Sequence, residues 1–262
     1  MSPTEPFTFY EFFAGGGMAR TGLGPGWRCR FANDFDARKA EAYRANFGGD
    51  DLEVGDVWGL DAKDLPGRAD LAWASSPCQD LSLAGARRGL GGERSSAFWG
   101  FWRLIEQLAS EGRAPRAIGM ENVTGLLTSH GGADFTALCA AFDRLGYRFG
   151  ALEIDAAMFT PQSRPRLFVL AVRETPVAAG GPGGFHGPAV MKAFERLPEA
   201  LKQAWVWWRL PRPHRGRPAP AARRGPLRRR RGVPAHSHRR VVPAVRPRSR
   251  RVAPSAARPR GR

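Results

Sequence analysis

The 262-residue sequence contains little cysteine: Cys29, Cys78 and Cys139 stand far apart. An odd number at such distances argues against both a disulfide framework and a zinc site, which would need clustered ligands. Long apolar runs are also missing, since no stretch approaches the roughly 18 residues of a membrane span. Residues 1–6 lack the basic start and apolar run of a secretory signal. We therefore expect a cytoplasmic protein without a metal site, in which any cysteine chemistry uses a free thiol.

Acidic residues and lysine are absent from the last 52 residues, 211–262, which contain 18 Arg and 10 Pro. The preceding 210 residues hold 23 basic and 24 acidic side chains, so the net charge of +17 comes from this tail. The tail has too little apolar surface to offset its ordering entropy and is predicted to be disordered. Charge therefore says little about what the rest of the chain does.

Residues 7–172 alternate between strand-like and helix-like segments, which is typical of an α/β protein with a mainly parallel sheet. Helical spacing of apolar residues predicts two amphipathic helices and places Cys139 in the core of the second. Residues 175–188, rich in Gly, Pro and Ala, indicate a linker or loop, and one helix is expected within 191–210. Strands are predicted at 7–12, 28–32, 52–54, 70–74, 117–120, 148–154 and 167–172, and helices around 98–108 and 135–145.

A glycine-rich turn follows the first predicted strand, at residues 13–17. Glycines there let the backbone bend sharply and approach a ligand at the carboxyl end of the strand. Asp34 stands 17 residues after Gly17, close to the roughly 20 expected for a carboxylate that binds ribose hydroxyls in a doubly wound fold. Phe35 is placed to lie against an adenine ring. The alternative is that Asp34 or Asp36 only caps the next helix.

Three further motifs stand at the ends of predicted strands. Ser76-Pro77-Cys78-Gln79 follows the strand at 70–74, and Met120-Glu121-Asn122-Val123 ends the strand at 117–120. Gln162-Ser163-Arg164-Pro165-Arg166 precedes the last strand. A Pro-Cys turn at a strand's carboxyl end faces the same crevice as the glycine turn. A lone cysteine is more often core packing than a nucleophile, but the two later motifs reverse this preference. Cys78 is therefore the candidate nucleophile.

In order, Phe-Ala-Gly-Gly-Gly, Asn-Asp-Phe-Asp, Gly55-Asp56-Val57, Pro-Cys-Gln, Glu-Asn-Val and Gln-Ser-Arg-Pro-Arg resemble the motif series of the DNA cytosine-5 methyltransferase family. The resemblance covers roughly residues 7–173. It implies a Rossmann-like S-adenosylmethionine-dependent methyltransferase fold with a mixed, mainly parallel sheet. It also implies S-adenosylmethionine as the cofactor, with a binding site lined by Phe13, Gly15, Gly17, Asp34, Phe35, Asp56 and Val57.

The resemblance assigns a catalytic role to each of four residues. Cys78 would add to carbon 6 of a cytosine flipped out of the duplex, so that carbon 5 can take the methyl group. Glu121, as a protonated acid, would assist at ring nitrogen 3. Arg166 would hold the cytosine carbonyl and Arg164 would help to position the neighbourhood. The implied substrate is double-stranded DNA, acted on by a monomer, with a cognate restriction endonuclease as a candidate partner in a restriction-modification system.

Family members continue into a target-recognition region and two further motifs, which this sequence lacks. We divide the chain into a catalytic core at 1–175, a linker with the start of a truncated recognition region at 176–210, and the tail at 211–262. The tail is interpreted either as a basic arm that binds phosphates without sequence preference or as a frameshift product. The absence of Lys, Asp and Glu favours the frameshift, in which case the chain can carry active-site residues and still be inactive.

Two other functions stay open. One branch of the family modifies transfer RNA, so an RNA cytosine-5 methyltransferase is the first alternative. A non-catalytic nucleic-acid-binding remnant is the second. An adenine or exocyclic-amine methyltransferase is disfavoured, because an Asp/Asn-Pro-Pro-aromatic turn would stand where this chain has Ser76-Pro77-Cys78-Gln79.

Overall fold

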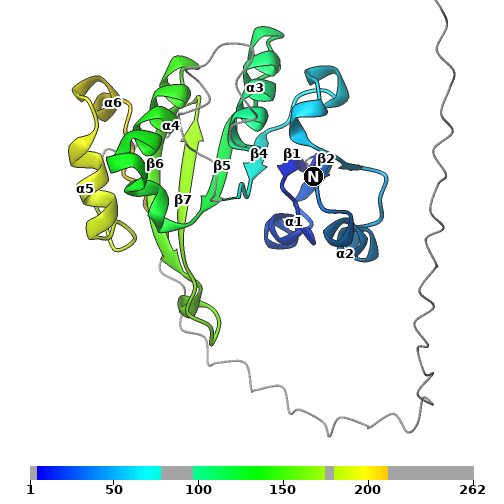
Figure 1. Ribbon diagram of the computed structural model, residues 1–262, viewed down its shortest axis with the longest axis horizontal. Helices are drawn as coiled ribbons and strands as arrows, with labels where there is room; N and C mark the ends of the chain where they lie inside the picture. Colours follow the sequence, from blue (N-terminus) through cyan, green and yellow to red (C-terminus); the bar gives the residue numbers. More distant parts are fainter. Residues whose placement is uncertain (1–4, 78–96, 175–179, 212–262) are drawn as a thin grey trace, which may run out of the picture. The chain divides into compact units, whose positions relative to one another are not determined.

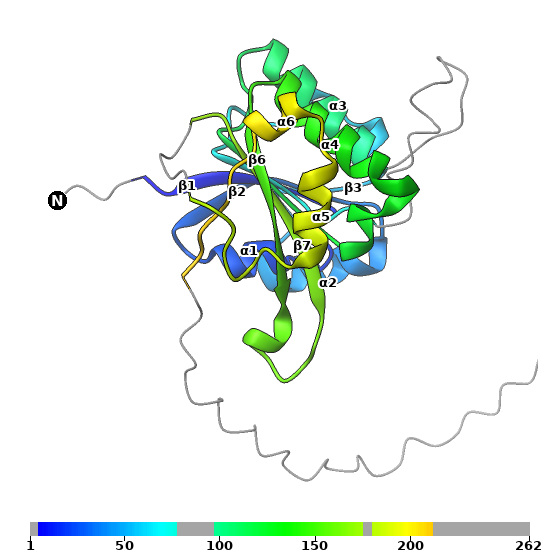
Figure 2. The same cartoon turned by 90° about the vertical axis from the view of Figure 1, so that its left-hand side faces the viewer.

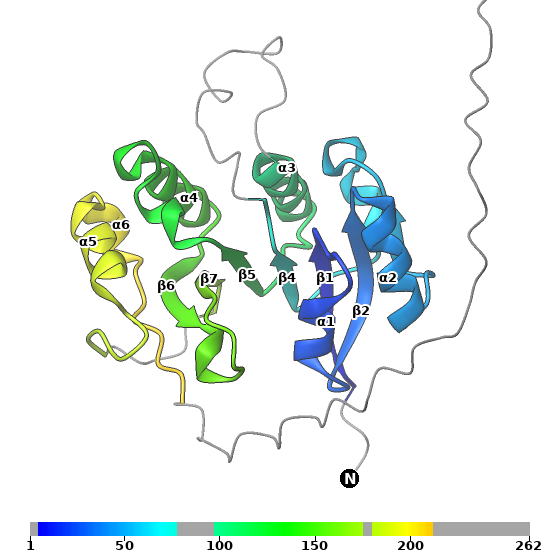
Figure 3. The ribbon, with the colours of Figure 1, turned by 60° about the horizontal axis from the view of Figure 1, so that its bottom comes forward.

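The computed structural model describes residues 5–77, 97–174 and 180–211. Its centre is a seven-stranded sheet in the order β3-β2-β1-β4-β5-β7-β6 (Figure 3). Strands β1 to β5 pair in parallel, whereas β7 runs antiparallel to both β5 and β6. The strands are β1 (Phe7–Phe12), β2 (Trp27–Asp34), β3 (Leu52–Val54), β4 (Leu71–Ala74), β5 (Ala117–Asn122), β6 (Arg148–Asp155) and β7 (Pro165–Val172). The predicted strands and the mixed, mainly parallel sheet are confirmed.

Helices cover both faces of the sheet. Figure 1 shows α3 and α4 on one side, and α1 and α2 on the other. The helices are α1 (Met18–Leu23), α2 (Ala37–Phe47), α3 (Ala97–Ser110), α4 (Ala133–Arg144), α5 (Pro188–Arg196) and α6 (Glu199–Gln203). None of these helices has the length and apolar content that crossing a membrane requires.

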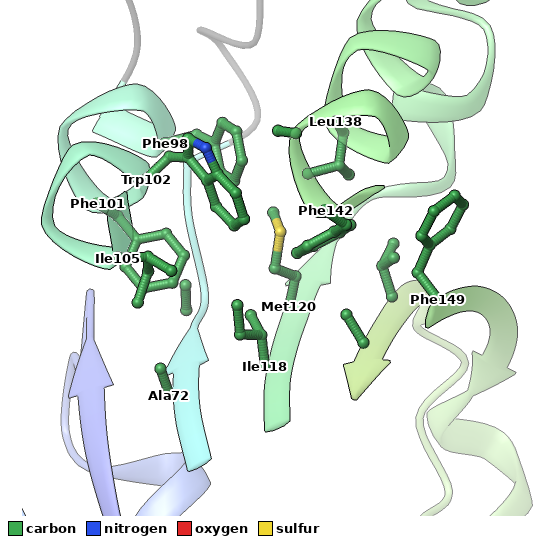
Figure 4. Close-up of a cluster of buried hydrophobic side chains, with 14 of the residues drawn as sticks. Ala72, Phe98, Phe101, Trp102, Ile105, Ile118, Met120, Leu138, Phe142 and Phe149 are labelled. Carbon is green, nitrogen blue, oxygen red and sulfur yellow. The ribbon is translucent and has the colours of Figure 1, made fainter. Parts of the chain in front are cut away.

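The larger core lies between the sheet and the helices α3 and α4 (Figure 4). Phe98, Phe101 and Trp102 are at most 1% exposed, and the Phe101 ring centroid lies 4.9 Å from that of Phe12 on β1. Small residues on β4, including Ala72, leave room for these rings. Burying one such ring stabilises the fold by roughly 2–3 kcal/mol. The two helices expected from apolar spacing are therefore confirmed, and Cys139 is a fully buried core residue.

The segment after residue 187 packs against β6 and extends the larger core. Val190 and Trp205 are buried there, and the Val206 amide donates a hydrogen bond of 2.7 Å to the Phe149 carbonyl on β6. The single helix expected within 191–210 is instead two short helices, α5 and α6. Pro198 explains the break, because proline lacks a backbone N–H and disfavours helical geometry in the residue before it.

Candidate active site

One edge of the sheet gathers the predicted motifs that lie within the described residues. The parallel strands β1 to β5 end at this edge, and the antiparallel strand β7 begins there, with Asn122 opposite Leu167. The chain passes from β1 outward to β2 and β3 and then returns to β4 on the other side of β1. In open α/β sheets such a reversal marks a crevice suited to ligand binding. The glycine-rich turn follows β1 and Pro77 follows β4, so both lie at this reversal.

The turn at residues 13–17 has a backbone that few other sequences would adopt. Gly15 and Gly17 have φ angles of 56° and 82°, and Phe13 also has a positive φ, of 57°. A Cβ atom at Gly17 would lie 2.2 Å from the Phe47 ring, so glycine is required there for space as well. A Cβ at Gly15 would meet no atom within 4 Å. Strained non-glycine backbone such as Phe13 tends to occur at functional sites.

Asp34 holds this turn against the end of β2. Its side chain is 5% exposed, and its two oxygens accept hydrogen bonds from the amides of Gly15 (2.7 Å) and Asp36 (2.8 Å). These bonds to backbone were not predicted. They leave further lone pairs on both oxygens, since an ionised carboxylate offers about four acceptor positions.

The other residues expected at the cofactor site lie around Asp34. Phe35 is 75% exposed, with its ring free of the core. The amide of Gly55 donates to the Asp34 carbonyl (3.0 Å), which brings the next residue, Asp56, to the same edge. Asp56 is half-buried and Val57 is part of the core. Capping of α2, the alternative role considered for Asp34 or Asp36, belongs to Asp36, which accepts from the amides of residues 38 and 39.

Glu11 is a buried carboxylate beneath the glycine-rich turn that the sequence analysis missed. It is 1% exposed, its Oε1 atom accepts from the Arg20 amide (3.4 Å), and Oε2 is buried without a partner in the described part of the chain. Burial raises the pKa of Glu11 from 4.5 to about 7. A charged residue within the apolar run of β1 was the available signal.

Replacing Glu11 with glutamine should remove a pH-dependent loss of stability. Between about pH 4.5 and 7 the folded protein keeps a proton that the unfolded chain has released, so stability falls as pH rises across this range. The full penalty above pH 7 is about 3 kcal/mol. Thermal unfolding followed from pH 5 to 8 should show this decline in the parent and a flatter profile in Glu11→Gln. Parallel profiles would contradict the assignment.

Glu121 and Arg166 meet at the β5–β7 side of this edge. The Nε atom of Arg166 lies 2.8 Å from Oε1 of Glu121, and the two side chains are 21% and 24% exposed. The register of β5 and β7, which pairs Asn122 with Leu167, brings the two residues together. One Glu121 oxygen thus has a fixed cationic partner, while both side chains still reach solvent.

Asn122 connects the end of β5 to the segment that leads to Cys78. Its side-chain amide lies 3.2 Å from the Ser76 hydroxyl and 3.4 Å from the Ser76 carbonyl, and Ser76 is 5% exposed. Cys78 itself lies outside the described residues. Asn122 was predicted only as a member of the Glu-Asn-Val motif, without a role of its own.

Arg164 belongs to the connection between β6 and β7, which extends beyond the rest of the sheet in Figure 2. Its side chain is exposed. Asp155 shapes this connection by accepting hydrogen bonds from the Arg164 amide (2.6 Å), the Ser163 hydroxyl (2.8 Å) and the Ala157 amide (2.9 Å). These bonds, led by that of Ala157, lower the pKa of Asp155. The hydrogen bonds of Asp155 therefore fix the backbone from which the side chains of Arg164 and Arg166 project.

The two cysteines that the structure describes are poorly suited to nucleophilic chemistry. Cys29 and Cys139 are both buried. Burial raises the pKa of Cys29 to about 12 and that of Cys139 well above its ordinary value. Because the thiolate is the reactive form, neither thiol is a good nucleophile at neutral pH.

Comparisons with known proteins agree with this arrangement. Residues 7–199 match the family model for C-5 cytosine-specific DNA methylase. The Type II methyltransferase M.BsuFI of Bacillus subtilis is 32% identical over 62% of this chain and 38% of its own length. The Type II methyltransferase M.HpaII of Haemophilus parainfluenzae is 32% identical over 75% of this chain and 51% of its own.

The fold is also found among solved structures. The S. pombe Dnmt2 methyltransferase aligns with a TM-score of 0.55 at 22% identity, over 66% of this chain and 53% of its own. The chain thus spans about half, or less, of the length of these relatives. Because the family model covers most of the sequence and its motifs meet at one sheet edge, the chain belongs to the C-5 cytosine-specific DNA methylase family.

Proposed function

We propose that the protein is a DNA cytosine-5 methyltransferase that uses S-adenosylmethionine and a covalent Cys78 adduct. The observation that carries the proposal is the Glu121–Arg166 pair, at the same sheet edge as the glycine turn. Asn122, next to Glu121, holds Ser76, which stands two residues before Cys78. These contacts support a cofactor and a target base bound side by side along this sheet edge.

The residues of the β1–β3 side fit S-adenosylmethionine. Gly15 faces open space, the exposed Phe35 ring can lie against an adenine, and Asp34 has unused acceptor capacity for ribose hydroxyls. Asp56 and Val57 would complete the pocket, together with Phe13 and Gly17. When bound, the cofactor would supply the methyl group.

The residues of the β4–β7 side would activate the base. The Cys78 thiolate would add to carbon 6 of a flipped cytosine, which makes carbon 5 nucleophilic. Glu121 would hydrogen-bond ring nitrogen 3, and Arg166 would bind the carbonyl oxygen as negative charge develops. After methylation, loss of the carbon 5 proton and of the thiolate would restore the ring. Arg164, on the exposed connection, would position this group.

Asp34→Ala should weaken binding of S-adenosylhomocysteine by roughly ten- to a hundredfold, since a hydrogen bond to a charged group contributes about 1.5–3 kcal/mol. The variant loses the acceptor for the ribose and also the bond that holds Gly15. Calorimetric titration would measure the change, with Asp36→Ala, which removes only the cap of α2, as the control. An unchanged dissociation constant for Asp34→Ala would remove it from the cofactor site.

The proposal can be tested on the chain as it stands by covalent trapping. DNA copied with 5-fluorocytosine in place of cytosine presents every sequence context, and the fluorine prevents release of the base from the thiol. A denaturation-resistant complex that requires S-adenosylmethionine would support the proposed function. Trapping on matching RNA alone would favour the RNA methyltransferase. Binding without a covalent complex on either polymer would favour the non-catalytic remnant.

We further propose that residues 211–262 come from an out-of-frame coding segment and stand in place of the recognition region. Their composition supports this, since 18 Arg occur without any Lys, Asp or Glu. Resequencing the coding DNA around Pro211 is the direct test, and a restored frame should encode a recognition region. The Type II names of the curated relatives support a restriction endonuclease as the functional partner.

A further inference from the structure

The helix α1, which follows the glycine-rich turn, has little to hold it in place by apolar packing. It has only six residues, none of them fully buried, and Gly17, the N-cap residue before it, offers no side-chain cap. Its one apolar contact is that of the partly buried Leu23 with a second, smaller core, which includes Phe9 and Tyr43. A helix this short is not stable by itself in water. Other contacts must therefore set the position of α1 and of the turn before it.

Arg20 supplies those contacts. Its Nη1 atom donates to the Tyr43 hydroxyl on α2 (2.8 Å) and to Oδ2 of Asp51, in the connection before β3 (2.7 Å). The guanidinium also lies over the Phe47 ring, 4.7 Å from its centroid. One side chain thus joins α1 to α2 and to the β3 connection.

The ion pair between Arg20 and Asp51 is partly shielded from solvent. The side chains of Arg20 and Asp51 are 24% and 20% exposed, so solvent screens them less than a surface pair. Asp51 is itself fixed, because its carbonyl accepts from the Ala32 amide on β2 at 2.6 Å. Through Asp51, the Arg20 side chain is therefore anchored to the sheet.

The same residues also touch the turn directly. The Arg20 amide donates to Glu11 on β1, and the Phe47 ring beneath the guanidinium fills the space where a Cβ of Gly17 would lie. The carbonyl of Gly17 accepts from the amide of Thr21, one residue after Arg20 (2.9 Å). Displacing Arg20 would therefore loosen both the packing of Gly17 on Phe47 and its hydrogen bond to Thr21.

We propose that Arg20 is a positioning residue for the cofactor turn: its guanidinium fixes α1 and thereby the backbone of residues 14–17. This inference rests on the proposed function, which assigns the turn to S-adenosylmethionine. Arg20 is not required to touch the cofactor, and lysine should replace it poorly. An ammonium group lacks the planar guanidinium that stacks on an aromatic ring, as that of Arg20 does on Phe47.

Hydrogen exchange of the full chain tests this inference without any ligand. In Arg20→Met, exchange in a peptide covering the turn should be at least about tenfold faster, with peptides from β5 and α4 unchanged. Arg20→Lys should lie between this variant and the parent, and Arg38→Met, at an exposed position on α2, should match the parent. Unchanged exchange at the turn, or equal acceleration throughout the chain, would overturn the inference.

A second variant and a second measurement separate this inference from the proposed function. Asp51→Asn leaves Arg20 in place but removes its ionic partner, and it should loosen the same peptide if Arg20→Met fails to fold. Titration with S-adenosylhomocysteine should show about tenfold weaker binding for Arg20→Met. If the parent binds no S-adenosylhomocysteine while the exchange pattern holds, the proposed function fails and the role of Arg20 in the turn stands. If the parent binds and Arg20→Met binds equally well, the positioning role is wrong.

Discussion

Replacing Cys78 with serine is expected to abolish methyl transfer while leaving cofactor binding nearly unchanged. A hydroxyl is far less nucleophilic than a thiolate at neutral pH, and losing a covalent nucleophile lowers the rate by orders of magnitude. Transfer of labelled methyl groups to DNA would be measured with a protein whose reading frame after residue 210 has been restored. S-adenosylhomocysteine titration would show that the cofactor side is intact.

The buried thiol of Cys29 provides a matched control for this substitution. The Cys29 sulfur lies 3.6 Å from the Tyr43 hydroxyl, and Cys29→Ser keeps a hydrogen-bonding group at this position. Burial raises the pKa of the Cys29 thiol to about 12, so the thiol stays protonated at neutral pH. We therefore expect Cys29→Ser to retain methyl transfer. Activity of Cys78→Ser within about tenfold of the parent would be too high for loss of a covalent nucleophile.

The second large effect is expected at the Glu121–Arg166 pair. Glu121→Gln should lower kcat by roughly 10²–10⁴, the usual contribution of a positioned general acid or base. Arg166→Met should lower it by roughly 10²–10³, as for a lost electrostatic contact to the transition state. Both variants should bind S-adenosylhomocysteine as the parent does, because the proposed cofactor residues lie at the carboxyl ends of β1 to β3.

The 2.8 Å contact between Glu121 and Arg166 makes the double variant informative. Residues in direct contact act as a unit, so the combined loss should be smaller than the product of the two single losses. Arg164→Met is the control, because its exposed side chain should cost less in kcat than that of Arg166. Near-normal kcat in Glu121→Gln would contradict the proposed role of this carboxylate.

The regular elements could be predicted because their apolar residues repeat with the period of the element. Phe98, Phe101 and Trp102 have helical spacing, and the structure buries all three against the sheet. The positions of the motifs could also be predicted, since each stands where a predicted strand ends or begins. The order of the strands brings these ends together, and an antiparallel β7 places Arg166 beside Glu121.

The contacts that hold the site in shape could not be predicted from pattern. Asp34 and Gly15 are 19 positions apart, and Arg20 and Asp51 are 31 apart, so their bonds depend on how separate segments fold back on one another. The six-residue α1 offers no apolar repeat to detect. Glu11 was missed but could have been predicted, because a carboxylate within an apolar strand signals an unusual environment.

The order of the strands has a consequence for how this family diversifies. Cofactor residues are proposed at the ends of β1 to β3 and base residues next to β4, β5 and β7, so the two sets adjoin where β1 pairs with β4. The roles proposed for both sets concern the cofactor and a single base. A lineage could therefore exchange one nucleic acid for another by changing distant segments, with every motif at this edge left intact. This explains why the six motifs alone are equally compatible with DNA and RNA.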